Sequence, residues 1–98
     1  MIASSTEKIK SARTLAFEAL YEIFEKNAYA NLTIQRILRR IPLKKEERHL
    51  LTELIYGVCR KYNYCLWLIN LISDRPMSKI HPVVRILLLL GIYQIVFL

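Results

Sequence analysis

The sequence predicts an all-α protein, a bundle of five helices, and three observations support this fold class. Hydrophobic residues make up 54% of the 98 positions, enough to bury a core. Only two glycines and three prolines occur, which disfavours both a turn-rich sheet and a disordered chain. Apolar residues also recur three or four positions apart, as on the inner face of a helix. Because chains of this length ordinarily form one core, we expect a single domain over residues 1–98.

The first helix is expected over residues 6–26. The stretch SSTEK supplies its start, because Ser4 with Glu7 resembles a capping box, although Ser5 or Thr6 could equally be the cap. The residues expected on its inner face share helical spacing: Ile9, Ala12, Ala16, Ala19, Leu20 and Ile23.

Two further helices are expected on either side of Pro42. Asn31 is a suitable cap for a shorter second helix, which Pro42 ends. A third helix is expected to begin near Lys44, with Glu46 and Glu47 in its first turn, where the helix dipole favours negative charge. The inner faces of these two helices are expected to hold Ile34, Ile37, Leu38 and Ile41, then Leu51, Leu54, Ile55 and Val58.

The fourth helix is expected to carry apolar residues at positions 66, 69 and 72, with Asn63 as its candidate cap. Residues 73–82, SDRPMSKIHP, are expected to form a connector, because Pro76 and Pro82 both resist helix interiors. Gly57 and Gly91 lie inside helical stretches, where glycine is unfavourable. We interpret both as signs of a close crossing between the third and fifth helices.

The fifth helix, RILLLLGIYQIVFL, is expected from Arg85 to Leu98 and is apolar on every face. Its two polar residues, Arg85 and Gln94, lie on opposite sides, which indicates a helix at the centre of a bundle. The thirteen residues after Arg85 would span only ~20 Å, short of the ~30 Å hydrocarbon core of a bilayer. We therefore expect no membrane segment. The N-terminus has no apolar core of a signal peptide either.

No constellation in the sequence indicates an active site, a metal site or a cofactor site. Cys59 and Cys65 are six positions apart and would not face each other on a helix, so we interpret them as small buried hydrophobes in a reduced compartment. His49 and His81 lack suitably spaced partners and are expected to be surface or cap residues. An enzyme confined to these residues is disfavoured.

Positive charge is concentrated in the middle of the chain. Of the net charge of +7, residues 34–62 contribute +5, with eight basic and three acidic residues. This excess favours an anionic partner, which could be nucleic acid, an acidic protein surface or acidic lipid, although a solvated helix face would show the same pattern. Six cations fall within thirteen residues: Arg36, Arg39, Arg40, Lys44, Lys45 and Arg48.

Three further cations, Lys8, Lys10 and Arg13, lie at the start of the expected first helix and are expected to join the same surface. Arg60 and Lys61 are weaker candidates. Tyr29 and Tyr62 could add stacking.

Several longer stretches of the chain carry a family resemblance. LLTELIYGVCR (Leu50–Arg60), LWLINLISDRPMSK (Leu66–Lys79) and LLLLGIYQIVFL (Leu87–Leu98) resemble the N-terminal, NusB-like domain of the bacterial 16S rRNA cytosine-C5 methyltransferase B family, also called Sun or RsmB. SARTLAFEAL (Ser11–Leu20) is similar to the first helix of that family. Free-standing NusB shares the fold, but its last helix usually reads L-R-x-x-x-Y-E, whereas here Gln94 follows Tyr93. The resemblance covers residues 8–98.

The resemblance implies a helical RNA-binding module that precedes a catalytic domain using S-adenosylmethionine. That domain is not present in these residues, so no catalytic role passes to Cys59 or Cys65. The implied RNA contacts come from the cations named above: Lys8, Lys10, Arg13, Arg36, Arg39, Arg40, Lys44 and Lys45.

The resemblance also sets expectations about partners. Those expected are ribosomal RNA and the methyltransferase domain of a longer cytoplasmic protein. The NusB-like fold normally continues past the fifth helix, so the chain is expected to be truncated, to expose apolar surface around that helix, and to form homo-oligomers. Three alternatives remain: a free-standing antitermination factor, a module that binds a ribosomal protein, and an adaptor packed on the methyltransferase domain.

Overall fold

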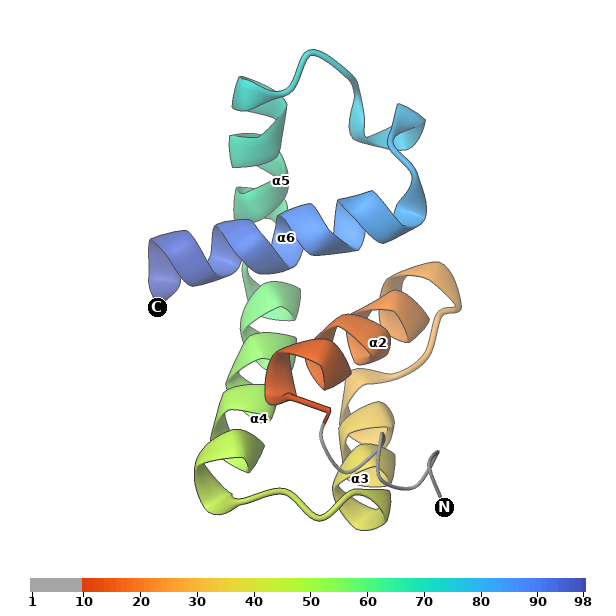
Figure 1. The fold of residues 1–98 in the computed structure, drawn as a ribbon. Helices are drawn as coiled ribbons and strands as arrows, with labels where there is room; N and C mark the ends of the chain where they lie inside the picture. The colour runs from red at the N-terminus through yellow and green to blue at the C-terminus, as the bar shows by residue number, and fades with distance from the viewer. Residues whose placement is uncertain (1–9) are drawn as a thin grey trace.

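The computed structural model describes residues 10–98, which fold into helices without any strand in that range (Figure 1). The elements are α2 (Ala12–Glu25), α3 (Ala30–Arg40), α4 (Lys45–Arg60), α5 (Tyr62–Ile72), the short 3₁₀ helix η1 (Met77–Lys79) and α6 (Pro82–Phe97). The predicted all-α bundle of five α-helices is thus confirmed for the described part of the chain.

The first of these helices begins later than expected. Ser11 has an extended backbone, and its hydroxyl accepts a hydrogen bond of 3.1 Å from the backbone N–H of Thr14, so Ser11 is the cap of α2. Residues 10 and 11 are not helical, and a continuous helix over residues 6–26 is therefore wrong. The expected cap at Ser4 and Glu7, with its alternatives Ser5 and Thr6, lies outside the described residues.

The link between α2 and α3 is shorter than the sequence suggested. Asn27 has a left-handed φ of 59°, which asparagine tolerates better than most residues, and Ala28 donates to the Glu22 carbonyl at 3.1 Å. This turn leaves Tyr29 as the extended residue before α3. Asn31 is therefore inside the helix, and its prediction as the cap is wrong.

A single residue, Lys61, separates α4 from α5. The backbone hydrogen bonds continue across it, because Lys61 donates to Gly57 and Cys65 donates to Lys61, both at 2.9 Å. The predicted cap Asn63 is consequently wrong, since it lies within α5. The two helices run end to end in Figure 1, and the molecule is elongated, with extents of 44 × 24 × 22 Å.

The last helix crosses the junction of α4 and α5 and packs on α2, α4 and α5 (Figure 1). It starts at Pro82 and not at Arg85, because proline at the first helical position leaves no backbone donor unpaired there. The predicted role of His81 as a cap is confirmed, since its Nδ1 accepts the backbone N–H of Val83 at 3.1 Å. The connector is correspondingly shorter and contains η1.

One core joins all five helices. Leu15 and Leu20 of α2, with Leu51 and Leu54 of α4, are at most 1% exposed. The core residues of α6 are Ile86, Leu89, Leu90 and Tyr93. Arg85 fixes the start of α6 to the end of α2, since its Nη2 donates to both carboxylate oxygens of Glu25 at 3.1 Å.

The two helical glycines have different surroundings. A Cβ at Gly57 would overlap the ring of Tyr93, so the close approach of α4 and α6 requires glycine there. Gly91 has nothing within 4 Å of a hypothetical Cβ, so its predicted role in the same crossing is wrong. Tyr93 also donates to Glu53 Oε2 at 2.6 Å. Burial, with this hydrogen bond, raises the pKa of Tyr93 to about 12.

Cys65 is buried as predicted, whereas Cys59 is only half-buried, and both thiols are free. Burial raises the pKa of each thiol. In residues 10–98, no helix has the length and apolarity that a membrane span requires.

Candidate nucleic-acid interface

Five exposed cations gather where α3 ends and α4 begins, at the bottom of Figure 1. We call this set the α3–α4 corner: Arg39, Arg40, Lys44, Lys45 and Arg48. Within residues 10–98, none of the five forms an ion pair. Five of the six cations that the sequence grouped thus lie on the two helix ends that flank this connection, although Arg40 and the pair Lys45 and Arg48 line different hollows.

The helix ends at the corner tolerate this charge for different reasons. Arg39 and Arg40 lie in the last turn of α3, where the helix dipole favours positive charge. Lys44 and Lys45 lie at the start of α4, where the dipole opposes it, but Glu46 and Glu47 occupy the same turn. The backbone N–H of Lys44 donates to Glu47 Oε1 at 3.3 Å, which closes this turn.

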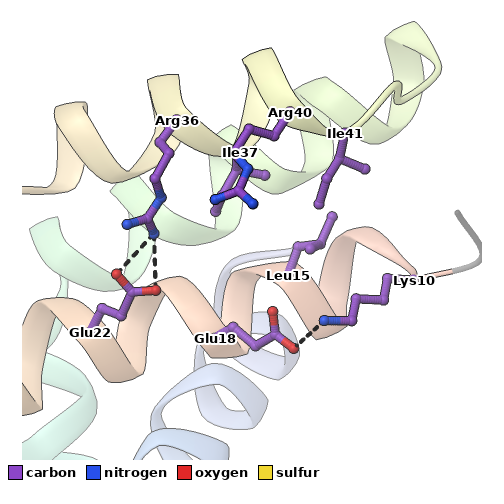
Figure 2. A pocket seen from close by; sticks show the side chains of 8 residues that line it. All are labelled: Lys10, Leu15, Glu18, Glu22, Arg36, Ile37, Arg40 and Ile41. Carbon is purple, nitrogen blue, oxygen red and sulfur yellow. Dashed lines mark hydrogen bonds and ion pairs between the residues drawn. The ribbon is translucent and has the colours of Figure 1, made fainter. Parts of the chain in front are cut away.

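A groove between α2 and α3 holds two of the other predicted contacts. Figure 2 shows Lys10 beside Glu18, with 2.9 Å between Nζ and Oε2, and Arg36 donating to both carboxylate oxygens of Glu22 at 2.8 and 2.9 Å. Arg40 points into the same groove (Figure 2). Lys10 and Arg36 thus already have carboxylate partners, which a phosphate would have to displace.

Arg13 does not join this groove. Nine positions separate it from Glu22, which places the two on opposite sides of α2. Its Nε donates to Gln94 Oε1 at 2.6 Å and so links α2 to α6. Lys8, the remaining predicted contact, lies outside the described residues.

The two aromatic candidates for base stacking differ in exposure. Tyr62 stacks on Phe24, with 4.8 Å between ring centroids, and is half-buried, whereas Tyr29 is 73% exposed. The structure brings two other rings to the surface that the sequence reasoning missed, Tyr64 and Trp67 on α5. Their spacing of three positions on a helix was the available signal.

Residues 10–98 hold neither a metal-type cluster nor a sheet. No group of three His, Cys, Asp or Glu side chains in residues 10–98 is arranged to hold a metal ion. They also form no strand, so they lack the sheet-edge crevice in which doubly wound enzymes bind nucleotide-like cofactors. The crevice that a Rossmann-like domain would offer to S-adenosylmethionine is thus absent from residues 10–98.

Comparison with known proteins identifies relatives. The NusB family model matches residues 10–98. The chain is 40% identical over 88 residues to a probable ribosomal RNA small subunit methyltransferase B of Synechocystis sp., covering 90% of this chain and 20% of that protein. It is 33% identical over 91 residues to a probable ribosomal RNA small subunit methyltransferase B of Bacillus subtilis, covering 93% of the chain and 20% of that protein.

A third relative is the ribosomal RNA small subunit methyltransferase B of Cronobacter sakazakii, 29% identical over 91 residues, covering 93% of the chain and 21% of that protein. The chain thus spans about a fifth of the length of these curated relatives. No solved structure matches significantly.

Proposed function

Because the chain belongs to the NusB family, we propose that it binds ribosomal RNA and that the α3–α4 corner makes the main phosphate contacts. The observation that carries this proposal is the set of five exposed cations without ion-pair partners in residues 10–98. Arginine forks bind phosphate bidentately, and each neutralised phosphate releases counterions. Binding should therefore depend steeply on salt and only weakly on sequence.

The other predicted cations have lesser roles in this proposal. Lys10 and Arg36 are secondary contacts, because their carboxylate partners compete with phosphate. Such part-exposed pairs are worth less than ~1 kcal/mol, so RNA could displace them at modest cost. Arg13, which is bonded to Gln94 on the other side of α2, is not expected to contact the RNA.

In the longer protein, the module would hold the ribosomal RNA while a separate domain methylates a cytosine with S-adenosylmethionine. The relatives named as ribosomal RNA small subunit methyltransferase B support this role, as does the match to about a fifth of their length. The present chain contributes RNA affinity and no chemistry. This assignment places the protein in the cytoplasm, with the methyltransferase domain as its covalent neighbour.

The test compares two double variants that lose equal charge. Arg39→Gln with Arg40→Gln removes two corner cations, whereas Arg75→Gln with Lys79→Gln removes two exposed cations from the connector between α5 and α6. Affinity for a ribosomal RNA fragment is measured by fluorescence anisotropy over a series of salt concentrations. The corner variant should lower the salt slope by ~1.4, from ~0.7 per lost contact. Equal losses in both variants would mean that only net charge matters.

A second candidate function is self-association through α6, favoured by its outward face. Val84, Leu87, Gly91, Ile95 and Leu98 form one stripe, and its four large side chains are 44–80% exposed. The stripe is symmetric about Gly91, so that two antiparallel copies could cross closely there, with Leu87 against Ile95. This crossing would also explain a glycine at a position where, within residues 10–98, an added Cβ would meet no neighbouring element.

The expected dimer is weak. The four side chains expose on the order of 450 Å² per copy, about half of what a standard interface buries per partner. Light scattering at high protein concentration should show a mass above that of the monomer, and Ile95→Glu should remove it. A monomer at every concentration would refute self-association and leave the face to a different partner, such as the methyltransferase domain.

A further inference from the structure

An aromatic cluster lies where the end of α6 meets the start of α5. The ring centroid of Tyr64 is 5.8 Å from that of Trp67 and 5.6 Å from that of Phe97. Phe97 in turn stacks on the buried Tyr93 at 5.3 Å. Tyr64, Trp67 and Phe97 are 45%, 55% and 37% exposed, and we call these three the aromatic ridge.

Two cations border the ridge. The Nζ atom of Lys61 lies 5.3 Å from the centroid of the Phe97 ring, within the range of a cation–π contact. Arg60 precedes it in the chain and is also exposed. Neither forms an ion pair within residues 10–98. Positive charge therefore lies beside three partly exposed rings, of which Tyr64 and Trp67 are the more exposed.

The combination of aromatic rings and positive charge suits a different part of an RNA than the α3–α4 corner does. The corner offers charge alone, which suits phosphates in a duplex or a single strand. The ridge adds rings on which an unpaired base can stack, and stacking is tolerant of sequence because every base has a π-face. Bases inside a duplex already stack on one another and are not accessible in this way.

We propose that the aromatic ridge, with Arg60 and Lys61, is a second RNA subsite that stacks an unpaired nucleobase. The proposal rests on the RNA binding proposed above and adds a preference for single-stranded over duplex RNA. The charge of Arg60 and Lys61 complements the phosphates on either side of the stacked base. The ridge is thereby assigned an occupant, an unpaired RNA segment.

The ridge and the corner lie toward opposite ends of α4. Sixteen residues of helix separate Lys45 from Lys61, which corresponds to ~24 Å along α4. Single-strand-binding modules commonly cover ~4–16 nucleotides, so an RNA segment of ordinary length could reach both places.

The chain itself provides the probe, because Trp67 is its only tryptophan. Tryptophan fluorescence is measured while an unstructured ten-nucleotide RNA, or a duplex of the same length, is added to the wild-type chain. Single-stranded RNA should quench Trp67 strongly, and the duplex should quench it much less. In anisotropy measurements with labelled RNA, Trp67→Leu should weaken single-strand affinity roughly tenfold and leave duplex affinity unchanged.

Two controls separate stacking from loss of apolar surface. Trp67→Phe retains a ring and should keep most of the single-strand affinity. Leu71→Ala removes an exposed aliphatic side chain one turn further along α5 and should change nothing, because aliphatic groups do not stack on bases. If Trp67→Leu and Leu71→Ala weaken binding equally, the stacking proposal is wrong.

The outcomes also separate the subsite from the proposed function. If the wild-type chain binds neither RNA form, both proposals fail. If it binds RNA through the corner, but Trp67→Leu has the wild-type affinity for single strands, only the subsite fails. If Trp67→Leu instead abolishes self-association without affecting RNA binding, the ridge is a protein interface and not an RNA subsite.

Discussion

The same substitution at the two helical glycines should change stability in opposite directions. In a helix interior, alanine is preferred to glycine by ~1 kcal/mol. At Gly91 no neighbouring element of residues 10–98 opposes this gain, because none has an atom within 4 Å of the added methyl group. At Gly57 the methyl group would overlap Cζ and Oη of Tyr93, so either the ring or a whole helix has to move.

The magnitudes follow from these surroundings. Overpacking a core of this kind costs ~1–3 kcal/mol. Moving the Tyr93 hydroxyl also puts at risk its 2.6 Å hydrogen bond to Glu53, worth ~1 kcal/mol. After the gain in helix propensity, Gly57→Ala should lower the free energy of unfolding by ~1–3 kcal/mol, whereas Gly91→Ala should raise it by ~1 kcal/mol.

Urea denaturation, monitored by the far-ultraviolet circular dichroism of the helices, measures both changes in the free energy of unfolding. A double-mutant cycle adds Tyr93→Leu, which should reduce the penalty of Gly57→Ala because the clashing ring is gone. The reasoning is refuted if Gly57→Ala is as stable as the wild type, or if Tyr93→Leu leaves its penalty unchanged. A destabilising Gly91→Ala would mean that another chain contacts Gly91.

Three further predictions concern single contacts. Between pH 10 and about 12 the folded state keeps the Tyr93 proton, whereas the unfolded state loses it. The free energy of unfolding of the wild type should therefore fall by up to ~3 kcal/mol relative to that of Tyr93→Phe as the pH rises through this window. Parallel pH profiles of the two proteins would disprove this prediction. Glu25→Gln should lower the free energy of unfolding by ~1–2 kcal/mol, because it weakens the half-buried bond to Arg85, and an unchanged thermal melt would show that water already separates the pair. Ile95→Glu should leave the melting temperature of the monomer unchanged, since Ile95 is 80% exposed, and a loss of secondary structure would contradict this placement.

The sequence predicted the number and order of the described helices because apolar spacing reports directly on buried faces. Helix starts were less predictable. Several residues near each helix end can act as a cap. The sequence pattern favours Ser4 as the first cap, whereas Ser11 caps α2. Asn31 has the chemistry of a cap, but after the left-handed turn at Asn27 the helix α3 begins two residues earlier than a cap at Asn31 would allow. Pro82 resists a helix interior and so predicts a connector, but the first position of a helix accepts proline, and α6 begins there.

The candidate site was only partly predictable for a related reason. Composition shows how many cations a segment has, but not which carboxylates reach them. Arg36 is paired by Glu22, fourteen positions earlier, and this contact depends on the packing of α2 against α3. The aromatic ridge likewise needs the end of α6 beside the start of α5, which brings Phe97 to Tyr64. Neither contact follows from local spacing.

The most direct test of the proposed RNA binding is the salt dependence of affinity for a ribosomal RNA fragment, measured for the wild type and for a quadruple variant. The variant carries Arg39→Glu, Arg40→Glu, Lys44→Glu and Lys45→Glu. We expect its affinity to fall at least ~100-fold at low salt, and its salt slope to fall by ~3, at an unchanged melting temperature. Wild-type affinity and slope in the quadruple variant would contradict the assignment of the α3–α4 corner as the RNA-binding surface.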